Sequence, residues 1–204
     1  KRPDIRVAVF ISGRGSNMKS LVHAAQDPEY PATIDLIVSN NPQAPGLAFA
    51  EEHNIPTLAI SHKDFDSREA FEMAILKAME PYTIDIVCLA GFMRILSPVF
   101  IEQWGERLIN INPSLLPKHK GLDTHENVLW EGDTQHGCTV HYVVPEVDSG
   151  EIIIQRAIEV SPEDDPDTLA ARVLKQEHAA YPEALKIVAE KLINEKIISA
   201  MKNA

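Results

Sequence analysis

Short apolar runs alternate along the first half of the chain with segments in which apolar residues recur at helical spacing. Ile5 to Ile11, Ile34 to Val38 and Ile84 to Ala90 are almost entirely apolar, as expected of parallel strands covered on both faces. This alternation predicts an α/β fold with a doubly wound, mostly parallel sheet and right-handed crossovers. The remaining elements predicted here are the helical pattern of Met18, Leu21, Val22 and Ala25, a helix from Gly46 to His53, a short strand from Thr57 to Ile60 and a helix from Ser67 to Glu80 capped by Ser67.

The second half has a different pattern. Gly137 to Val144 and Glu151 to Val160 read as strands, and the six residues between them are too few for a crossover helix. These two strands are therefore expected to pair antiparallel and to extend the sheet. From Asp167 to about Ala200 the apolar positions have helical spacing, with an interruption expected at Pro182.

Composition narrows the classes of function. A chain of 204 residues, 45% of them hydrophobic, can bury a full core, so we expect a single domain over residues 1–204. The 30 acidic and 19 basic residues argue against a nucleic-acid or anionic-membrane surface. Cys88 and Cys138 lie in or beside apolar runs, which favours buried thiols in a reducing compartment. No apolar run reaches membrane-span length, and Lys1 to Asp4 lead into a strand without a signal-peptide core, so we expect a soluble, cytoplasmic protein.

A glycine-containing turn, Ser-Gly-Arg-Gly-Ser-Asn at residues 12–17, joins the first predicted strand to the first helix. Free backbone N–H groups and the helix dipole at such a position favour an anion. The turn is therefore a candidate phosphate site. It matches neither the P-loop nor the full dinucleotide fingerprint, and a purely structural turn is the alternative.

The segment from Leu108 to Pro117 begins as an apolar strand and ends between two prolines. Side chains alternate along a strand, so Asn110 and Asn112 are expected to point to the same side. Two amides at the carboxyl end of a strand can donate hydrogen bonds to one small ligand, and ligands of open α/β sheets bind at that end. The alternative is that both are loop asparagines that satisfy backbone groups.

Two further loops are candidates. Gly91 to Ser97 follows a buried strand and combines large apolar groups with Arg94, which suits a pocket for a flat ligand with a polar edge. The alternative is a hydrophobic loop packed under a helix. Asp148 lies in the turn between the two antiparallel strands, where aspartate is commonly a backbone acceptor.

Several short motifs follow one another in an order found in one enzyme family. They are Ser-Gly-x-Gly-Ser-Asn at 12–17, Ala-Gly-Phe-Met-Arg-Ile-Leu at 90–96, Asn-x-x-Pro-Ser-Leu-Leu-Pro at 110–117, His125, Gly-Cys-Thr-Val-His at 137–141, Asp-x-Gly at 148–150 and Gln-Glu-His at 176–178. This combination resembles the phosphoribosylglycinamide formyltransferases, the folate-dependent family of de novo purine biosynthesis, over nearly the whole chain. The resemblance implies a Rossmann-like formyltransferase fold. It also implies transfer of a formyl group from 10-formyltetrahydrofolate to the amine of glycinamide ribonucleotide through a tetrahedral intermediate, without a metal.

The resemblance also implies roles for individual residues. The nucleotide-phosphate half would be about 1–105, and the folate and catalytic half about 106–204. Asn110 would donate to the formyl oxygen, Asp148 would orient water or take up the proton of the attacking amine, and Arg68 would lie near the folate glutamate tail. The other implied residues are Gly15, Ser16 and Asn17 at the phosphate, Glu177 at the ribose, Phe92, Met93, Arg94, Ile95, Leu96, Val143, Val144 and Val147 around the folate, and His125 and His141 in support.

Asn112 departs from the family pattern, which has a histidine at this position. An imidazolium could offer a charged donor and transfer a proton, whereas a neutral amide can only donate, and more weakly. The chain could therefore be a slow enzyme, an inactivated variant or a paralogue that binds folate or ribonucleotide without catalysis. A formyltetrahydrofolate hydrolase, with water as acceptor, is a further alternative. The expected partners are small-molecule substrates, and we expect a monomer or a homodimer.

Overall fold

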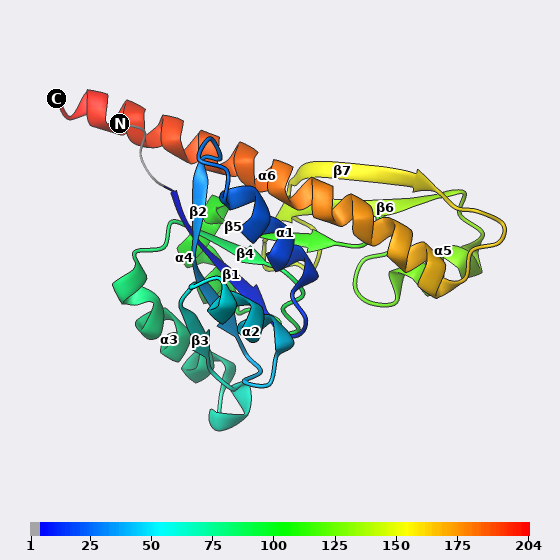
Figure 1. Ribbon diagram of the computed structural model, residues 1–204, viewed down its shortest axis with the longest axis horizontal. Helices are drawn as coiled ribbons and strands as arrows, with labels where there is room; N and C mark the ends of the chain where they lie inside the picture. The colour runs from blue at the N-terminus through cyan, green and yellow to red at the C-terminus, as the bar shows by residue number, and fades with distance from the viewer. Residues whose placement is uncertain (1–4) are drawn as a thin grey trace.

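The computed structural model describes residues 5–204 (Figure 1), so Lys1 to Asp4, expected to lead directly into the first strand, lie outside the described residues. Within these described residues, a seven-stranded sheet in the order β3-β2-β1-β4-β5-β6-β7 forms the centre of the fold. Its strands are β1 Ile5–Ile11, β2 Ala32–Ser39, β3 Thr57–Ala59, β4 Ile86–Leu89, β5 Leu108–Asn112, β6 Gln135–Tyr142 and β7 Ile152–Glu159.

Strands β1 to β5 pair in parallel, and β6 and β7 add antiparallel pairs at one edge. Because β6 runs against β5, Asn110 lies opposite His141 and Asn112 lies opposite Thr139. The structure confirms the predicted fold class, including the antiparallel extension in the second half of the chain.

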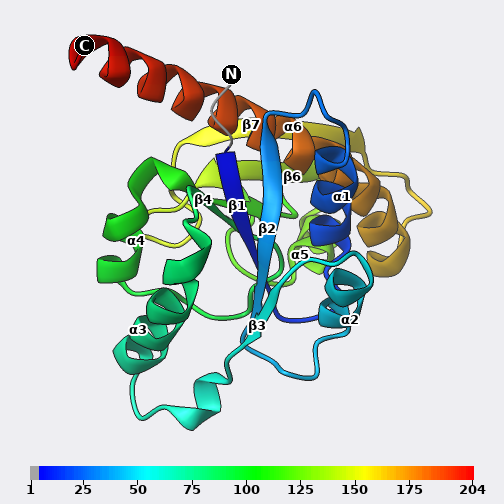
Figure 2. The ribbon, with the colours of Figure 1, turned by 60° about the vertical axis from the view of Figure 1, so that its left-hand side comes forward.

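Helices cover both faces of the sheet (Figure 2). Buried residues of α1, α2, α5 and α6 share one apolar cluster with the strands, and those of α3 and α4 share the other. This arrangement explains why the parallel strands are apolar on both faces. The helices are α1 Ser16–Ala25, α2 Pro45–Glu52, α3 Arg68–Met79, α4 Pro98–Trp104, α5 Thr124–Glu131 and α6 Pro166–Lys202, with short 3-10 turns at His62–Asp64, Glu80–Tyr82 and Gly105–Arg107.

Helix α6 contradicts one prediction, because it continues through Pro182 as a single helix of 37 residues. An internal proline costs about 3 kcal/mol through the lost hydrogen bond and the clash with the preceding turn. Packing around it offsets this cost. Tyr181 is fully buried and its hydroxyl donates to the Leu89 carbonyl over 2.7 Å, while the Pro182 carbonyl accepts from Tyr30. Figure 1 shows α6 lying along the sheet with its carboxyl end extending beyond it.

Across residues 5–204, none of the helices combines the length and apolarity that crossing a bilayer requires.

Candidate active site

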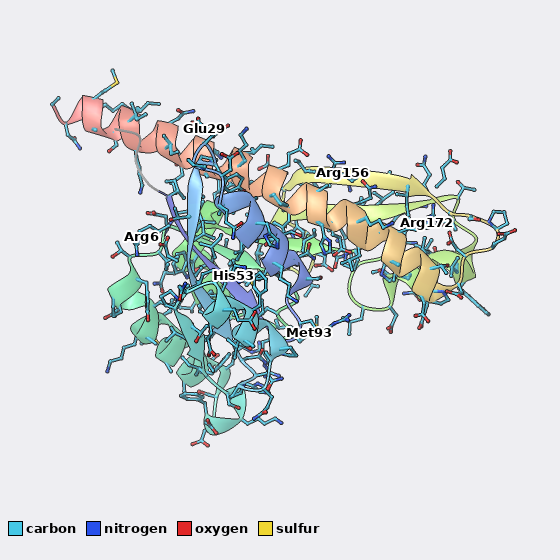
Figure 3. All side chains as sticks on the ribbon, viewed as in Figure 1. Arg6, Glu29, His53, Met93, Arg156 and Arg172 are labelled. Carbon is cyan, nitrogen blue, oxygen red and sulfur yellow. The ribbon has the colours of Figure 1, made fainter. Side chains whose placement is uncertain are left out.

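The carboxyl ends of β1, β4 and β5 lie side by side, so the segments that follow these strands meet at the carboxyl end of the parallel part of the sheet. The backbone N–H of Met93, after β4, donates to the Ser12 hydroxyl, after β1, over 2.8 Å. Figure 3 shows Met93 close to the end of β1. The glycine turn and the apolar loop predicted as ligand sites are therefore joined directly.

The glycine turn has the backbone that an anion site needs. Gly15 caps α1 in the left-handed region, with φ at 70°, and no side-chain cap bond is found there among residues 5–204. The first N–H groups of a helix have no intrahelical partner, so those of Ser16 and Asn17 remain available. Helix α2 braces the turn, because the Gly46 N–H donates to the Gly13 carbonyl over 3.1 Å.

Asn17 and Glu177, two predicted substrate-binding residues, contact each other although they are 160 positions apart. The Asn17 amide donates to a Glu177 carboxylate oxygen over 3.1 Å, and both side chains are buried. Burial raises the pKa of Glu177, and the hydrogen bond from Asn17 acts in the opposite direction. The other amide atom, Asn17 Oδ1, is buried and has no partner within the described part of the chain. A carboxylate and an amide thus meet beside the Gly15 turn.

Strand β5 holds Asn110 and Asn112 on one face, as predicted. Ile109 and Ile111 pack into the apolar cluster on the other side, together with α1 and α6. The two amides nevertheless have different surroundings. Asn110 Nδ2 lies 3.5 Å from His141 Nε2, whereas Asn112 Nδ2 donates to the Ser114 hydroxyl over 2.7 Å. The Asn112 donor therefore has an acceptor within its own loop.

Asp148 links two loops rather than closing its own turn. Its Oδ2 accepts from the Gly121 N–H over 2.7 Å, and its Oδ1 lies 3.8 Å from His141 Nε2. Burial lowers the pKa of His141, while the charge of Asp148 opposes this shift. The structure thus brings together Asn110, His141 and Asp148. The Gly121 N–H was not identified from the sequence, because a backbone donor in a loop has no residue-type signal.

The predicted folate-binding residues divide into core and surface. The Phe92 ring packs edge-on against Phe10 with centroids 5.3 Å apart, Leu96 is buried, and Val143 packs against the same cluster. By contrast, the loop after β4 exposes Met93 (66%) and Ile95 (63%), and the turn between β6 and β7 exposes Val147 (55%) and Val144 (37%).

Two arginines were also predicted to contact folate. Arg94 and Arg68, the latter at the start of α3, are exposed, and no ion pair of either guanidinium is found within residues 5–204. Exposed apolar groups suit a flat ligand, and exposed guanidinium groups suit an anionic tail.

His125 lies apart from these contacts. Its Nδ1 is 2.9 Å from His136 Nε2, and burial, with the nearby charge of His125, lowers the pKa of His136 to about 4. His125 therefore ties α5 to β6. Nearby, His119, Glu131 and Asp133 offer atoms within 4.8 Å of one another, a spacing that could hold a metal.

A cavity of about 320 Å³ lies at the amino end of β5, between that end and α6, lined by residues that include Trp104, Arg107 and Lys191. The predicted site residues are not among its walls.

Known proteins resemble this chain in sequence and in fold. Residues 5–185 match the family model described as Formyl transferase. The chain is 43% identical to the phosphoribosylglycinamide formyltransferase of Escherichia coli over 178 residues, covering 87% of this chain and 84% of that protein. A crystal structure of phosphoribosylglycinamide formyltransferase from Brucella melitensis superimposes with a TM-score of 0.88 and 49% identity, covering 92% of this chain and 96% of that one.

The human trifunctional purine biosynthetic protein adenosine-3 is 48% identical over 184 residues, which cover 90% of this chain. The chain spans 18% of the length of that relative. The match over residues 5–185, together with the relatives and the fold, shows that the chain belongs to the formyl transferase family.

Proposed function

We propose that the chain transfers a formyl group from 10-formyltetrahydrofolate to the amine of glycinamide ribonucleotide, a step of de novo purine biosynthesis. The names of the relatives support this reaction. One observation carries the proposal for this chain: two groups of polar residues lie at the end of the sheet where β1 and β5 finish. One is the glycine turn with Glu177, and the other consists of Asn110, His141 and Asp148.

The ribonucleotide binds at the turn after β1. Backbone N–H groups of Gly15, Ser16 and Asn17 receive the phosphate, because they lie at a helix N-terminus where the dipole favours negative charge. Glu177 accepts hydrogen bonds from the ribose hydroxyls, and its contact with Asn17 holds it at this turn. This assignment supports a nucleotide acceptor over water.

The folate binds between the loop after β4 and the turn before β7. Phe92 and Leu96 form its base with Val143, while the exposed Met93, Ile95, Val144 and Val147 close on the ring. Arg94 and Arg68 provide positive charge for the glutamate tail. The fit is supported by the exposed apolar groups, which lie on both loops and are otherwise left in water.

The chemistry is acyl transfer. The amine attacks the formyl carbon, and Asn110 donates to the oxygen as negative charge develops on it. Asp148 stabilises the positive charge that develops on the amine; the amine then loses its proton, the carbonyl re-forms and tetrahydrofolate leaves. No step requires a metal. Asn112 favours a second candidate, a non-catalytic binding protein, because its amide cannot transfer a proton.

Product analysis separates these candidates. Purified protein is supplied with 10-formyltetrahydrofolate with and without glycinamide ribonucleotide, and formylated ribonucleotide, tetrahydrofolate and formate are measured by mass spectrometry. We expect formylated ribonucleotide and tetrahydrofolate in equal amounts. Formate released without ribonucleotide would support a hydrolase, and binding of both ligands without product would support the binding protein.

The cellular setting is part of the proposal. Cys88 and Cys138 are free and buried, and burial raises the pKa of each thiol, to about 12 for Cys138, which keeps both unreactive and is compatible with the cytoplasm. We propose a monomer or a homodimer that acts on small molecules and binds neither nucleic acid nor membrane. Light scattering of the purified chain measures the oligomeric state.

A further inference from the structure

The histidine opposite Asn110 lies beside the proposed reaction, with its Nε2 3.5 Å from Asn110 Nδ2. We propose that His141 is the acid–base residue of this chain and takes up the proton of the attacking amine in place of a residue at position 112. This inference rests on the proposed function. It is carried by the position of His141 Nε2 between Asn110 and Asp148.

The tautomer of His141 follows from its surroundings. Its Nδ1 lies 2.9 Å from the Tyr142 carbonyl oxygen, which can only accept, so Nδ1 carries the hydrogen. The lone pair of the neutral ring is therefore on Nε2, the atom that faces Asn110. With 2% of its surface exposed, the ring is held in this orientation. A neutral imidazole with an oriented Nε2 is the form that accepts a proton.

Asp148 is placed to stabilise the protonated ring. Its Oδ1 is 3.8 Å from Nε2, and its Oδ2 is fixed by the Gly121 N–H. Lys120 donates to the Ser149 hydroxyl over 2.9 Å, a second link between the same two loops. Catalytic contacts of this length in a ligand-free site commonly shorten when substrate binds. A proton on Nε2 would thus have a carboxylate partner already in place.

Asn112 cannot serve this purpose. It does not titrate, and one of its two N–H donors bonds the Ser114 hydroxyl. The residue opposite it on β6 is Thr139, whose hydroxyl donates to the Ser114 carbonyl and accepts from the Leu116 N–H. Position 112 is therefore tied to a hydrogen-bond network with Ser114 and Thr139 at the end of β5. His141, two residues along β6 from Thr139, places an imidazole opposite Asn110 instead.

The proposed step balances. The amine nitrogen forms a bond to the formyl carbon, and the carbonyl electron pair moves to oxygen, which accepts from one hydrogen of the Asn110 amide while the other faces Nε2. The ammonium proton moves to His141 Nε2. The electron pair on oxygen then re-forms the carbonyl, the bond to the folate nitrogen breaks, and that nitrogen takes the proton from Nε2. The imidazole returns to its neutral form.

Burial, the hydrogen bond to the Tyr142 carbonyl and the charge of Asp148 set the pH dependence expected of His141. Burial lowers its pKa, and Asp148 is the charged group within the described residues whose field acts against this shift. The neutral ring therefore predominates at neutral pH. Turnover should decline on the acidic side as His141 is protonated before the amine arrives.

The test compares His141→Gln with His136→Gln, which removes an even more deeply buried imidazole from the same strand. Loss of general acid–base catalysis typically costs about 10²–10⁴-fold. We expect His141→Gln to lower kcat by at least about 10²-fold with little change in the KM for ribonucleotide, and to remove the acidic limb of the pH profile. His136→Gln should keep both kcat and the limb. Added imidazole should restore part of the turnover of His141→Ala.

A second measurement does not depend on folding of the variants. Nitrogen-15 NMR of the wild-type imidazoles should show His141 as the Nδ1–H tautomer that titrates below the ordinary range for histidine. A wild-type kcat and an unchanged acidic limb in His141→Gln would overturn the assignment, as would a protonated Nε2 in the neutral ring. Absence of formyl transfer by the wild-type protein would instead overturn the proposed function, and this assignment with it.

Discussion

Replacing Gly15 by alanine tests the proposed phosphate site through backbone geometry. Gly15 has φ at 70°, and a Cβ there would lie 2.8 Å from the Cε of the buried Met18 side chain. The left-handed conformation costs a residue with a Cβ about 1–2 kcal/mol, and Met18 must also shift. For a protein of this size each kcal/mol lowers the melting temperature by about 2–4 °C, so we expect a decrease of about 2–8 °C.

Ligand binding should change more selectively than stability. If the turn relaxes to relieve the strain, the N–H groups of Ser16 and Asn17 move away from the phosphate, and a loss of about 1.4 kcal/mol weakens ribonucleotide binding tenfold. Folate binding, on the other loops, should be unchanged. Calorimetric titration with each ligand and a thermal melt measure both effects.

Gly13 provides the matched control, because it lies in the same turn, is outside the left-handed region and would place its Cβ in open space. Gly13→Ala should therefore bind and melt like the wild type. The reasoning would be refuted if Gly15→Ala also bound ribonucleotide with wild-type affinity, or if both variants lost affinity equally.

Three further predictions concern the reaction, the folate loop and the buried carboxylate. Asn112→His should raise turnover by about tenfold, or 1.4 kcal/mol. The gain should be larger in the His141→Gln background, where the new histidine supplies the missing imidazole; a double-mutant cycle with the same gain in turnover in both backgrounds would contradict this coupling. Ile95→Glu should weaken folate binding in a titration without changing the melting temperature, whereas Val99→Glu, at a somewhat more exposed position on α4, should change neither. Burial raises the pKa of Glu177 in the folded protein, so the protein loses stability as the pH rises from the pKa of this carboxyl in the unfolded chain to its pKa in the folded one. Glu177→Gln should therefore melt at a higher temperature than the wild type at neutral pH, but bind ribonucleotide more weakly. Melts of Glu177→Gln that match wild type at both acidic and neutral pH would show that this carboxylate carries no burial cost.

The sequence was sufficient for the sheet but not for the long helix. Apolar runs and turn lengths determine which segments are strands and which strands pair antiparallel, and these depend on local spacing. The interruption predicted at Pro182 was wrong. The helix propensity of proline is a property of the local sequence, whereas the hydrogen bonds of Tyr181 to β4 and β5 are tertiary contacts that local sequence does not show.

The sequence could name the residues of the candidate site, but it could not show which of them contact one another. Strand alternation placed Asn110 and Asn112 on one face, but it could not show that Asn112 donates to Ser114 while Asn110 faces His141. The contact between Asn17 and Glu177 joins opposite ends of the chain, so only the family resemblance suggested that the two act together.

Turnover of Asn110→Ala tests most directly the central claim that formyl transfer takes place at the carboxyl end of β5. Loss of one oxyanion donor lowers kcat by about 10²–10³-fold, and because the bond strengthens as the oxyanion forms, we expect that loss with little change in the KM for either substrate. Asn127→Ala, on the exposed surface of α5, is the matched control and should keep wild-type turnover. Equal kcat values for the two variants would contradict the account.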